Sequence, residues 1–193
     1  MARTLKLKIL YGVLLIVIAR VVLATVRTNE KLLFPLIICL IIPGRVVGYL
    51  WKDLITGRRL MDRKQFSAAF PKLETFIRKV EKSPWIDHLS WISPSFYTVS
   101  GKAMAHNNIG CCHLEQGTLR AATESFEQAL EIDHLYPLPH FNLAKICELE
   151  GNSAASLRHL EEARQLGYTG GEFDQQMDRL KAVYAKLEPA SKL

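Results

Sequence analysis

The chain has 193 residues, of which 49% are hydrophobic and 23% are charged, and its formal net charge is +6 at pH 7. This length allows one globular domain with an appendage. Residues 1–65 carry 12 Lys or Arg against 3 Asp or Glu, whereas the rest of the chain carries 13 against 16. Because the positive charge lies in the most apolar region, the composition favours a membrane segment over a nucleic-acid-binding surface.

Two apolar segments, residues 7–26 and 32–51, are each about 20 residues long, which is enough to cross a hydrocarbon core of about 30 Å. Basic residues precede the first segment and follow the second, so the positive-inside rule places both termini in the cytoplasm. The sequence therefore predicts an integral membrane protein, with a two-helix transmembrane anchor at residues 1–52 that contacts the lipid bilayer. The alternative has one spanning helix, with the second segment in the membrane interface, because its uninterrupted apolar run is short and contains Pro35.

Residues 53–102 are expected to form a basic juxtamembrane linker, a helix and an aromatic-rich connector. The helical spacing of apolar residues over 66–80 resembles the second helix of a degenerate helix pair, and Pro71 predicts a kink or a later start. The connector, residues 83–100, has three interpretations: packing against the next helices, resting on a bilayer, or an exposed site for a partner.

Residues 103–170 contain an internal repeat with a period of about 34 residues, which places Gly117 over Gly151. The same shift aligns His106 with His140, Asn108 with Asn142, Ala121 with Ala155, Glu127 with Glu161, and Ala129 with Ala163. A period of this length is typical of helix–turn–helix units that bury their apolar faces by stacking on one another. The two glycines stand where one helix ends and the next begins.

This pattern resembles the tetratricopeptide repeat (TPR) family, with units at 103–136 and 137–170. The first unit reads Asn108-Ile109-Gly110, followed by Ala122, Phe126 and Ala129; the second reads Asn142-Leu143-Ala144, followed by Ser156, Leu160 and Ala163. His106 and His140 depart from the family pattern, which usually has an aromatic residue there. The resemblance implies an all-α fold, a short α-solenoid after the N-terminal hairpin.

The resemblance also implies that the first helix of each unit lines a concave groove for a partner peptide or helix. Carried over residue by residue, the groove consists of Asn107, Asn108, Cys111, Leu114, Leu138, Phe141, Asn142, Lys145, Glu148 and Leu149, with Met104 and Glu115 on the same face. In the family, asparagines at Asn108 and Asn142 can bond a ligand's main chain. Phe141 and Leu149 would serve as apolar anchors and Lys145 as the cation.

Residues 171–193 are expected to form a capping helix and a tail, because apolar residues from Phe173 to Leu187 recur at helical spacing above a polar face. The last three residues, Ser191-Lys192-Leu193, match a peroxisomal address. We interpret this match as a coincidence, because a membrane hairpin inserted during synthesis is rarely routed that way.

No constellation for catalysis, a metal or a cofactor is recognisable in the sequence. His106, His113 and His140, together with Cys111, Cys112 and Cys147, lack an established ligand spacing, and the repeat already explains most of them as packing residues. Glu161 and Glu162 are interpreted as part of a solvated helix face. Phosphate-binding loops and nucleophile motifs are also missing from the sequence.

The sequence thus predicts a non-enzymatic, membrane-anchored adaptor or scaffold that presents a cytosolic TPR groove to another protein. The alternative is a small structural or assembly subunit of a larger membrane complex, bound through its hairpin, with Gly44 and Gly48 at close helix contacts. A homo-oligomer is a further expectation, since two units make a short array.

Overall fold

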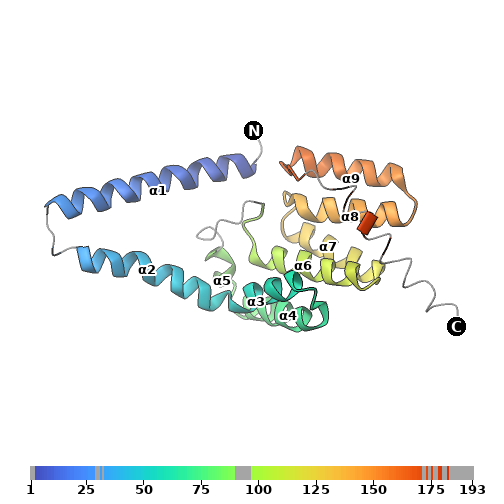
Figure 1. The fold of residues 1–193 in the computed structure, drawn as a ribbon, viewed down its shortest axis with the longest axis horizontal. Helices are drawn as coiled ribbons and strands as arrows, with labels where there is room; N and C mark the ends of the chain where they lie inside the picture. Colours follow the sequence, from blue (N-terminus) through green and yellow to red (C-terminus); the bar gives the residue numbers. More distant parts are fainter. Residues whose placement is uncertain are drawn as a thin grey trace.

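The computed structural model describes residues 3–28, 31, 33–89 and 97–170, together with residues 173, 175, 178, 179 and 182. Every regular element in these residues is helical (Figure 1), which confirms the predicted all-α class. The helices are α1 (Arg3–Thr28), α2 (Leu33–Leu50), α3 (Lys52–Asp62), α4 (Phe66–Lys82), α5 (Trp85–His88), α6 (Gly101–Glu115), α7 (Leu119–Ile132), α8 (Pro137–Leu149) and α9 (Ser153–Gln165).

Three helix pairs, α3/α4, α6/α7 and α8/α9, lie side by side in a stack that α1 and α2 extend away from (Figure 1). Two residues after its last helical residue, the first helix of each pair is followed by a residue with positive φ: Lys64 at 59°, Gly117 at 81° and Gly151 at 76°. Each also closes with the same two backbone bonds, such as Thr118 N to His113 O at 3.0 Å and Gly117 N to Leu114 O at 3.3 Å. This is the Schellman arrangement, which favours glycine at the left-handed position.

The pair α3/α4 extends the repeat pattern towards the N-terminus. Helix α3 occupies part of the stretch that the sequence analysis assigned to a basic linker. Helix α4 begins at Phe66 and runs through Pro71, so the predicted later start is not observed. The buried residues of α4 are Ala69, Leu73, Phe76, Ile77 and Val80, which are the apolar positions that predicted this helix.

The largest buried cluster joins α3, α4 and α6 around Trp51, which is 3% exposed. The Trp51 ring meets Phe76 edge-on, with ring centroids 5.7 Å apart, and its indole N–H donates to the Ile86 carbonyl at 3.3 Å. Trp51, the last residue of the second predicted membrane segment, is therefore a core residue, because Phe76 of α4 packs against its ring and Ile86 of α5 accepts its N–H.

The connector before α6 is tied to the stack by polar contacts. Ser100 caps α6, accepting from Ala103 N at 3.1 Å, and its hydroxyl donates to Asp87 Oδ2 at 2.8 Å. Thr98 Oγ1 donates to Asp133 Oδ2, at the end of α7, at 2.6 Å. The described part of residues 83–100 thus packs against the repeats, although Trp85 is 55% exposed, and residues 90–96 lie outside the described residues.

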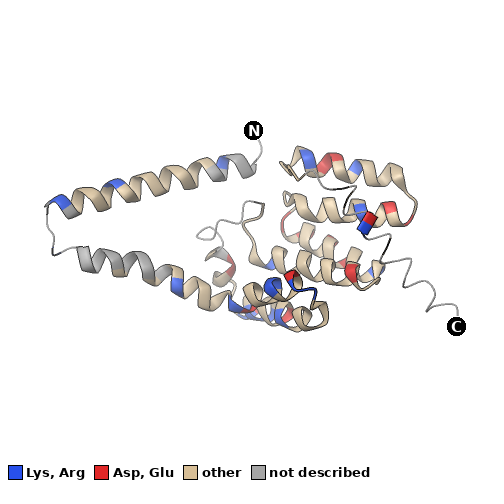
Figure 2. Cartoon of the chain, viewed as in Figure 1, with Lys and Arg blue, Asp and Glu red and all other residues tan. Residues whose placement is uncertain are grey.

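The N-terminal helices correct the membrane prediction. Within the part of the chain that the structure describes, no helix is both long enough and apolar enough to span a membrane. Spanning requires about 20 predominantly apolar residues, whereas α2 has 18 and includes Pro43 and Arg45. Figure 2 shows that basic residues also recur at intervals along α1. The transmembrane hairpin at 1–52 is therefore unsupported, and the predicted integral-membrane location with cytoplasmic termini is wrong.

At the other end of the chain, the described residues 173, 175, 178, 179 and 182 are helical, in line with the predicted helix. The tripeptide Ser191–Leu193, considered as a peroxisomal address, lies outside the described residues.

Candidate functional site

The first helices of the two predicted units, α6 and α8, present neighbouring faces. On α6, Asn107, Cys111 and Glu115 are spaced four residues apart and therefore share one face. On α8, the facing residues include Asn142 and Lys145. We call the surface formed by Asn107, Cys111 and Glu115 of α6 with Phe141, Asn142 and Lys145 of α8 the α6/α8 face.

A chain of hydrogen bonds joins the two helices across this face. The Asn142 Nδ2 group donates to Asn107 Oδ1 at 3.0 Å and also contacts Cys111 Sγ at 3.4 Å. Asn142 Oδ1 accepts from Lys145 Nζ at 3.0 Å. The side chains of Asn107 and Asn142 are both buried, and their amides join helix to helix.

Lys145 is the cation of the α6/α8 face and is 7% exposed. Its Nζ lies 4.4 Å from the centre of the Phe141 ring, a cation–π geometry. The pKa of Lys145 falls from 10.5 to about 8, chiefly because burial penalises the charged form; Arg179 adds to the lowering, whereas Cys111 and Glu115 oppose it. The ammonium group therefore remains mostly charged at pH 7, at the expense of folding free energy.

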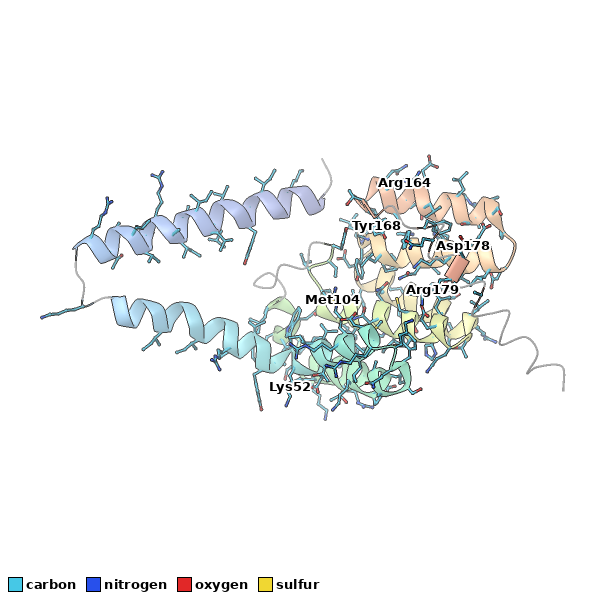
Figure 3. All side chains as sticks on the ribbon, viewed as in Figure 1. Lys52, Met104, Arg164, Tyr168, Asp178 and Arg179 are labelled. Carbon is cyan, nitrogen blue, oxygen red and sulfur yellow. The ribbon has the colours of Figure 1, made fainter. Side chains whose placement is uncertain are left out.

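The C-terminal segment covers the same face. Phe173 meets Phe141 edge-on with ring centroids 5.8 Å apart, and Tyr168 lies against the Phe141 ring with centroids 4.4 Å apart. Arg179 pairs with both carboxylate oxygens of Glu115, including Nη1 to Oε2 at 2.8 Å (Figure 3). The chain thus places an aromatic ring and a guanidinium group of its own on the α6/α8 face, and the guanidinium group comes from a residue 64 positions after Glu115.

Coverage of this face explains why six consecutive residues of α8, 141–146, are all buried. An amphipathic helix at the end of a stack would expose one side. Here α7 and α9 bury two sides of α8, and Tyr168 with Phe173 closes the side that would otherwise face solvent.

The remaining predicted groove residues lie elsewhere. Leu114 and Leu149 join the cluster around Phe126 beneath the face, and Leu138 packs against the cluster of Tyr136. Glu148 is at the turn to α9, where it accepts from Ser153 Oγ at 3.2 Å. Asn108 is turned away from Asn107, and its buried Nδ2 has no hydrogen-bond partner among the described residues.

Three residues that cover this face were missed by sequence reasoning: Tyr168, Phe173 and Arg179. The repeat pattern does not predict a role for Tyr168, because the equivalent residue of the first unit is His134. Phe173 and Arg179 were assigned to a helix capping the end of the stack, and periodicity does not specify where such a helix docks. Glu115 was on the predicted face, but its partner was not identified.

The thiols of α6 do not form a reactive site. Burial raises the pKa of Cys111 to about 11 and that of Cys112 to about 12. Both are therefore protonated at neutral pH, and the thiol is a much weaker nucleophile and metal ligand than the thiolate. Cys111 instead serves as an acceptor for Asn142.

A separate cleft of about 320 Å³ lies between α4, α6 and α7. Its walls include Phe70, His106, His113, Glu124 and Gln128. Phe70 meets the His113 ring edge-on with centroids 5.3 Å apart, so this cleft is bordered by a packed aromatic pair.

Metal-ligating side chains converge at one other place in the described residues, where His140 of α8 meets His159 and Glu162 of α9. Of the histidines and cysteines that the sequence analysis considered as metal ligands, only His140 belongs to this cluster. In comparisons with known proteins, no family model matches this chain, and no curated protein matches its sequence.

Proposed function

We propose that this chain is a protein–protein interaction adaptor of the TPR type. Its α6/α8 face binds a helical segment of another protein, and its own C-terminal segment occupies that face when the partner is absent. The observation that carries this proposal is the pair of contacts made by Phe173 and Arg179, which act as an internal ligand. The TPR assignment is supported by the repeat spacing of Gly117 and Gly151, which terminate equivalent helices with positive φ.

The internal ligand indicates the chemistry of the partner. Phe173 and Arg179 are six residues apart, which corresponds to about 9 Å along a helix at about 1.5 Å per residue. The partner is thus a helix with an aromatic or large apolar residue and an arginine six positions later. The aromatic residue meets Phe141, and the arginine forms a two-oxygen pair with Glu115, which favours arginine over lysine.

Tethering makes the internal ligand a strong competitor. A segment joined by a short linker acts at an effective concentration on the order of millimolar, so a partner of moderate affinity is excluded until the segment is released. Disrupting Phe173 and Arg179 together should therefore raise the affinity for an external segment without altering the face itself.

The probe is a labelled synthetic peptide of residues 169–187, and the readout is fluorescence anisotropy with the full chain. Phe173→Ala with Arg179→Glu should bind this peptide at least about tenfold more tightly than the wild-type chain, because the internal competitor is lost. In a chain opened instead by Phe173→Ala with Arg179→Ala, adding Glu115→Arg should abolish binding, and a peptide that carries Arg179→Glu should restore it.

Glu148→Arg is the matched control, because Glu148 lies on α8 outside the face and should leave peptide binding unchanged. A photocrosslinker at position 141 of the opened chain should then capture a partner segment that contains the aromatic residue and the arginine. If the opened chain fails to bind the peptide, or if Glu115→Arg and Glu148→Arg behave alike, the proposed face is wrong. Capture that depends on α1 instead would favour the alternative of a structural subunit.

A further inference from the structure

Three potential metal ligands converge between the last two helices of the stack. The Nδ1 atoms of His140 and His159 are 3.3 Å apart. Glu162 Oε2 lies 2.9 Å from the first and 3.4 Å from the second. His159 and Glu162 are three residues apart, so they share one face of α9, and His140 reaches them from α8.

These three distances match the triangle of donors around a tetrahedral zinc ion. Zinc bonds to nitrogen and oxygen are about 2.0–2.1 Å long, so two donors in tetrahedral geometry lie about 3.3 Å apart. The circle through the three atoms has a radius of about 1.9 Å, which is shorter than such a bond. A single ion placed just above their plane can therefore reach all three donors at bonding distance.

The orientation of the rings agrees with this geometry. The ring centroids of His140 and His159 are 5.6 Å apart, whereas their Nδ1 atoms are 3.3 Å apart, so both nitrogens face the space between the rings. The side chain of His140 is 15% exposed, that of His159 31% and that of Glu162 51%. The site is thus enclosed on the His140 side and open to water at the carboxylate.

The first unit provides an internal comparison. The shift that places Gly151 over Gly117 replaces His140, His159 and Glu162 by His106, Ser125 and Gln128. Stacking of a repeat unit therefore needs neither the second histidine nor the carboxylate. In the first unit, Ser125 Oγ instead donates to the Ala121 carbonyl of its own helix at 2.8 Å. Packing within the repeat accounts for a histidine at position 140 but not for the convergence of three ligands in the second unit.

We propose that His140, His159 and Glu162 form a binding site for a zinc-class divalent ion. Two imidazole nitrogens and one carboxylate oxygen suit Zn²⁺, and a water molecule completes the coordination at the open side. Because the ligands come from α8 and α9, the ion cross-links the last helix pair of the stack. The competing explanation is a metal-free hydrogen-bonded cluster, in which an imidazole N–H donates to Glu162.

Metal binding to the full-length chain separates the two explanations. The chain, first stripped with a chelator, is titrated with Zn²⁺ in competition with a chromophoric indicator, and with Co²⁺ to record its visible absorption. The wild-type chain should bind one equivalent, show the intense visible bands of four-coordinate Co²⁺, and unfold at a higher temperature when Zn²⁺ is present. His159→Ala and Glu162→Gln should each weaken binding by at least about tenfold.

Two control variants test whether other ligands are responsible. His106→Ala removes the equivalent histidine of the first unit, and Cys147→Ser removes a half-buried thiol of α8; both should bind Zn²⁺ as the wild type does. Glu162→Gln preserves the shape of the side chain, so its loss of binding cannot be attributed to misfolding when its circular dichroism is unchanged. Absence of stoichiometric Zn²⁺ binding, or equal binding by the wild type, His159→Ala and Glu162→Gln, would overturn the proposal.

Discussion

Replacing Lys145 with methionine tests whether the α6/α8 face is as dry as the structure indicates. Methionine keeps the length of the side chain and can still cover Phe141, but it carries no charge. The wild-type ammonium group is buried among Phe141, Asn142, Cys111, Glu115 and Arg179, and burial lowers its pKa from 10.5 to about 8. The folded chain thus binds this proton more weakly than the unfolded chain.

The sign of the pH dependence follows from this difference. The unfavourable contribution is fully present below the folded-state pKa of about 8 and disappears as the pH rises through 10.5. At pH 7 the contribution is about 3 kcal/mol, and between pH 7 and pH 9 it falls by about 1 kcal/mol. Methionine removes it at every pH, although the unpaired Asn142 oxygen then costs about 1–3 kcal/mol.

The difference in unfolding free energy between Lys145→Met and wild type should therefore decrease by about 1 kcal/mol from pH 7 to pH 9. Urea unfolding followed by circular dichroism at the two pH values measures it. The raised pKa of Cys112 lowers stability as the pH rises above 9, but this contribution is shared by both proteins and cancels in the difference. Lys72→Met, at an exposed position of α4, controls for loss of a positive charge.

An unchanged difference between pH 7 and pH 9 would refute this reasoning. It would mean that water reaches Lys145 in solution, and hence that the C-terminal segment does not cover the face. The same comparison in Phe173→Ala provides a second check, since opening the face should reduce the pH dependence of the difference.

Three further predictions follow from the packing of the helices. Gly110→Ala should destabilise the chain by about 1–3 kcal/mol in chemical unfolding, because its Cβ would lie 2.5 Å from Phe126 Cε1. Gly44→Ala is the control and should be neutral or stabilising, because its Cβ meets no described atom within 4 Å. Gly151→Ala should lower stability by about 1 kcal/mol through strain at φ of 76°, and Gly151→Asn by less; equal effects would count against the turn geometry. Deleting residues 1–32 should change the unfolding free energy by less than about 0.5 kcal/mol, because the residues of the three buried clusters begin at Val47. The same deletion should reduce aggregation, measured by light scattering, because α1 exposes Leu10, Ile16 and Leu23.

The repeat itself was recognisable in the sequence because its determinants are local. Gly117 and Gly151 terminate helices through backbone bonds within a few residues, and only a positive φ allows those bonds. The apolar spacing of α4 likewise predicted its buried face from Ala69 to Val80. The equivalent turn after α3 was not recognised because Lys64 occupies the left-handed position that glycine holds elsewhere. A lysine side chain does not predict the positive φ that Lys64 adopts.

Hydropathy was misleading in residues 1–52 because an apolar run does not specify its environment. Trp51 ended the second predicted membrane segment, yet α4 and α5 enclose it and accept its N–H. Burial in a protein core and burial in a bilayer draw on the same residue types, so the distinction depends on which helices lie within reach.

The amino-acid sequence by itself determined the helix pairs α6/α7 and α8/α9, the apolar face of α4, and the positions of Asn107, Asn142 and Lys145 along α6 and α8. The tertiary structure alone decided what covers that face, because docking of Phe173 and Arg179 depends on contacts with side chains that are distant in the sequence. It also brought His159 and Glu162 to His140, a convergence that the repeat pattern concealed, since their counterparts in the first unit are Ser125 and Gln128. Local spacing fixes which side of a helix a residue occupies, whereas its neighbours are set by how separate helices stack.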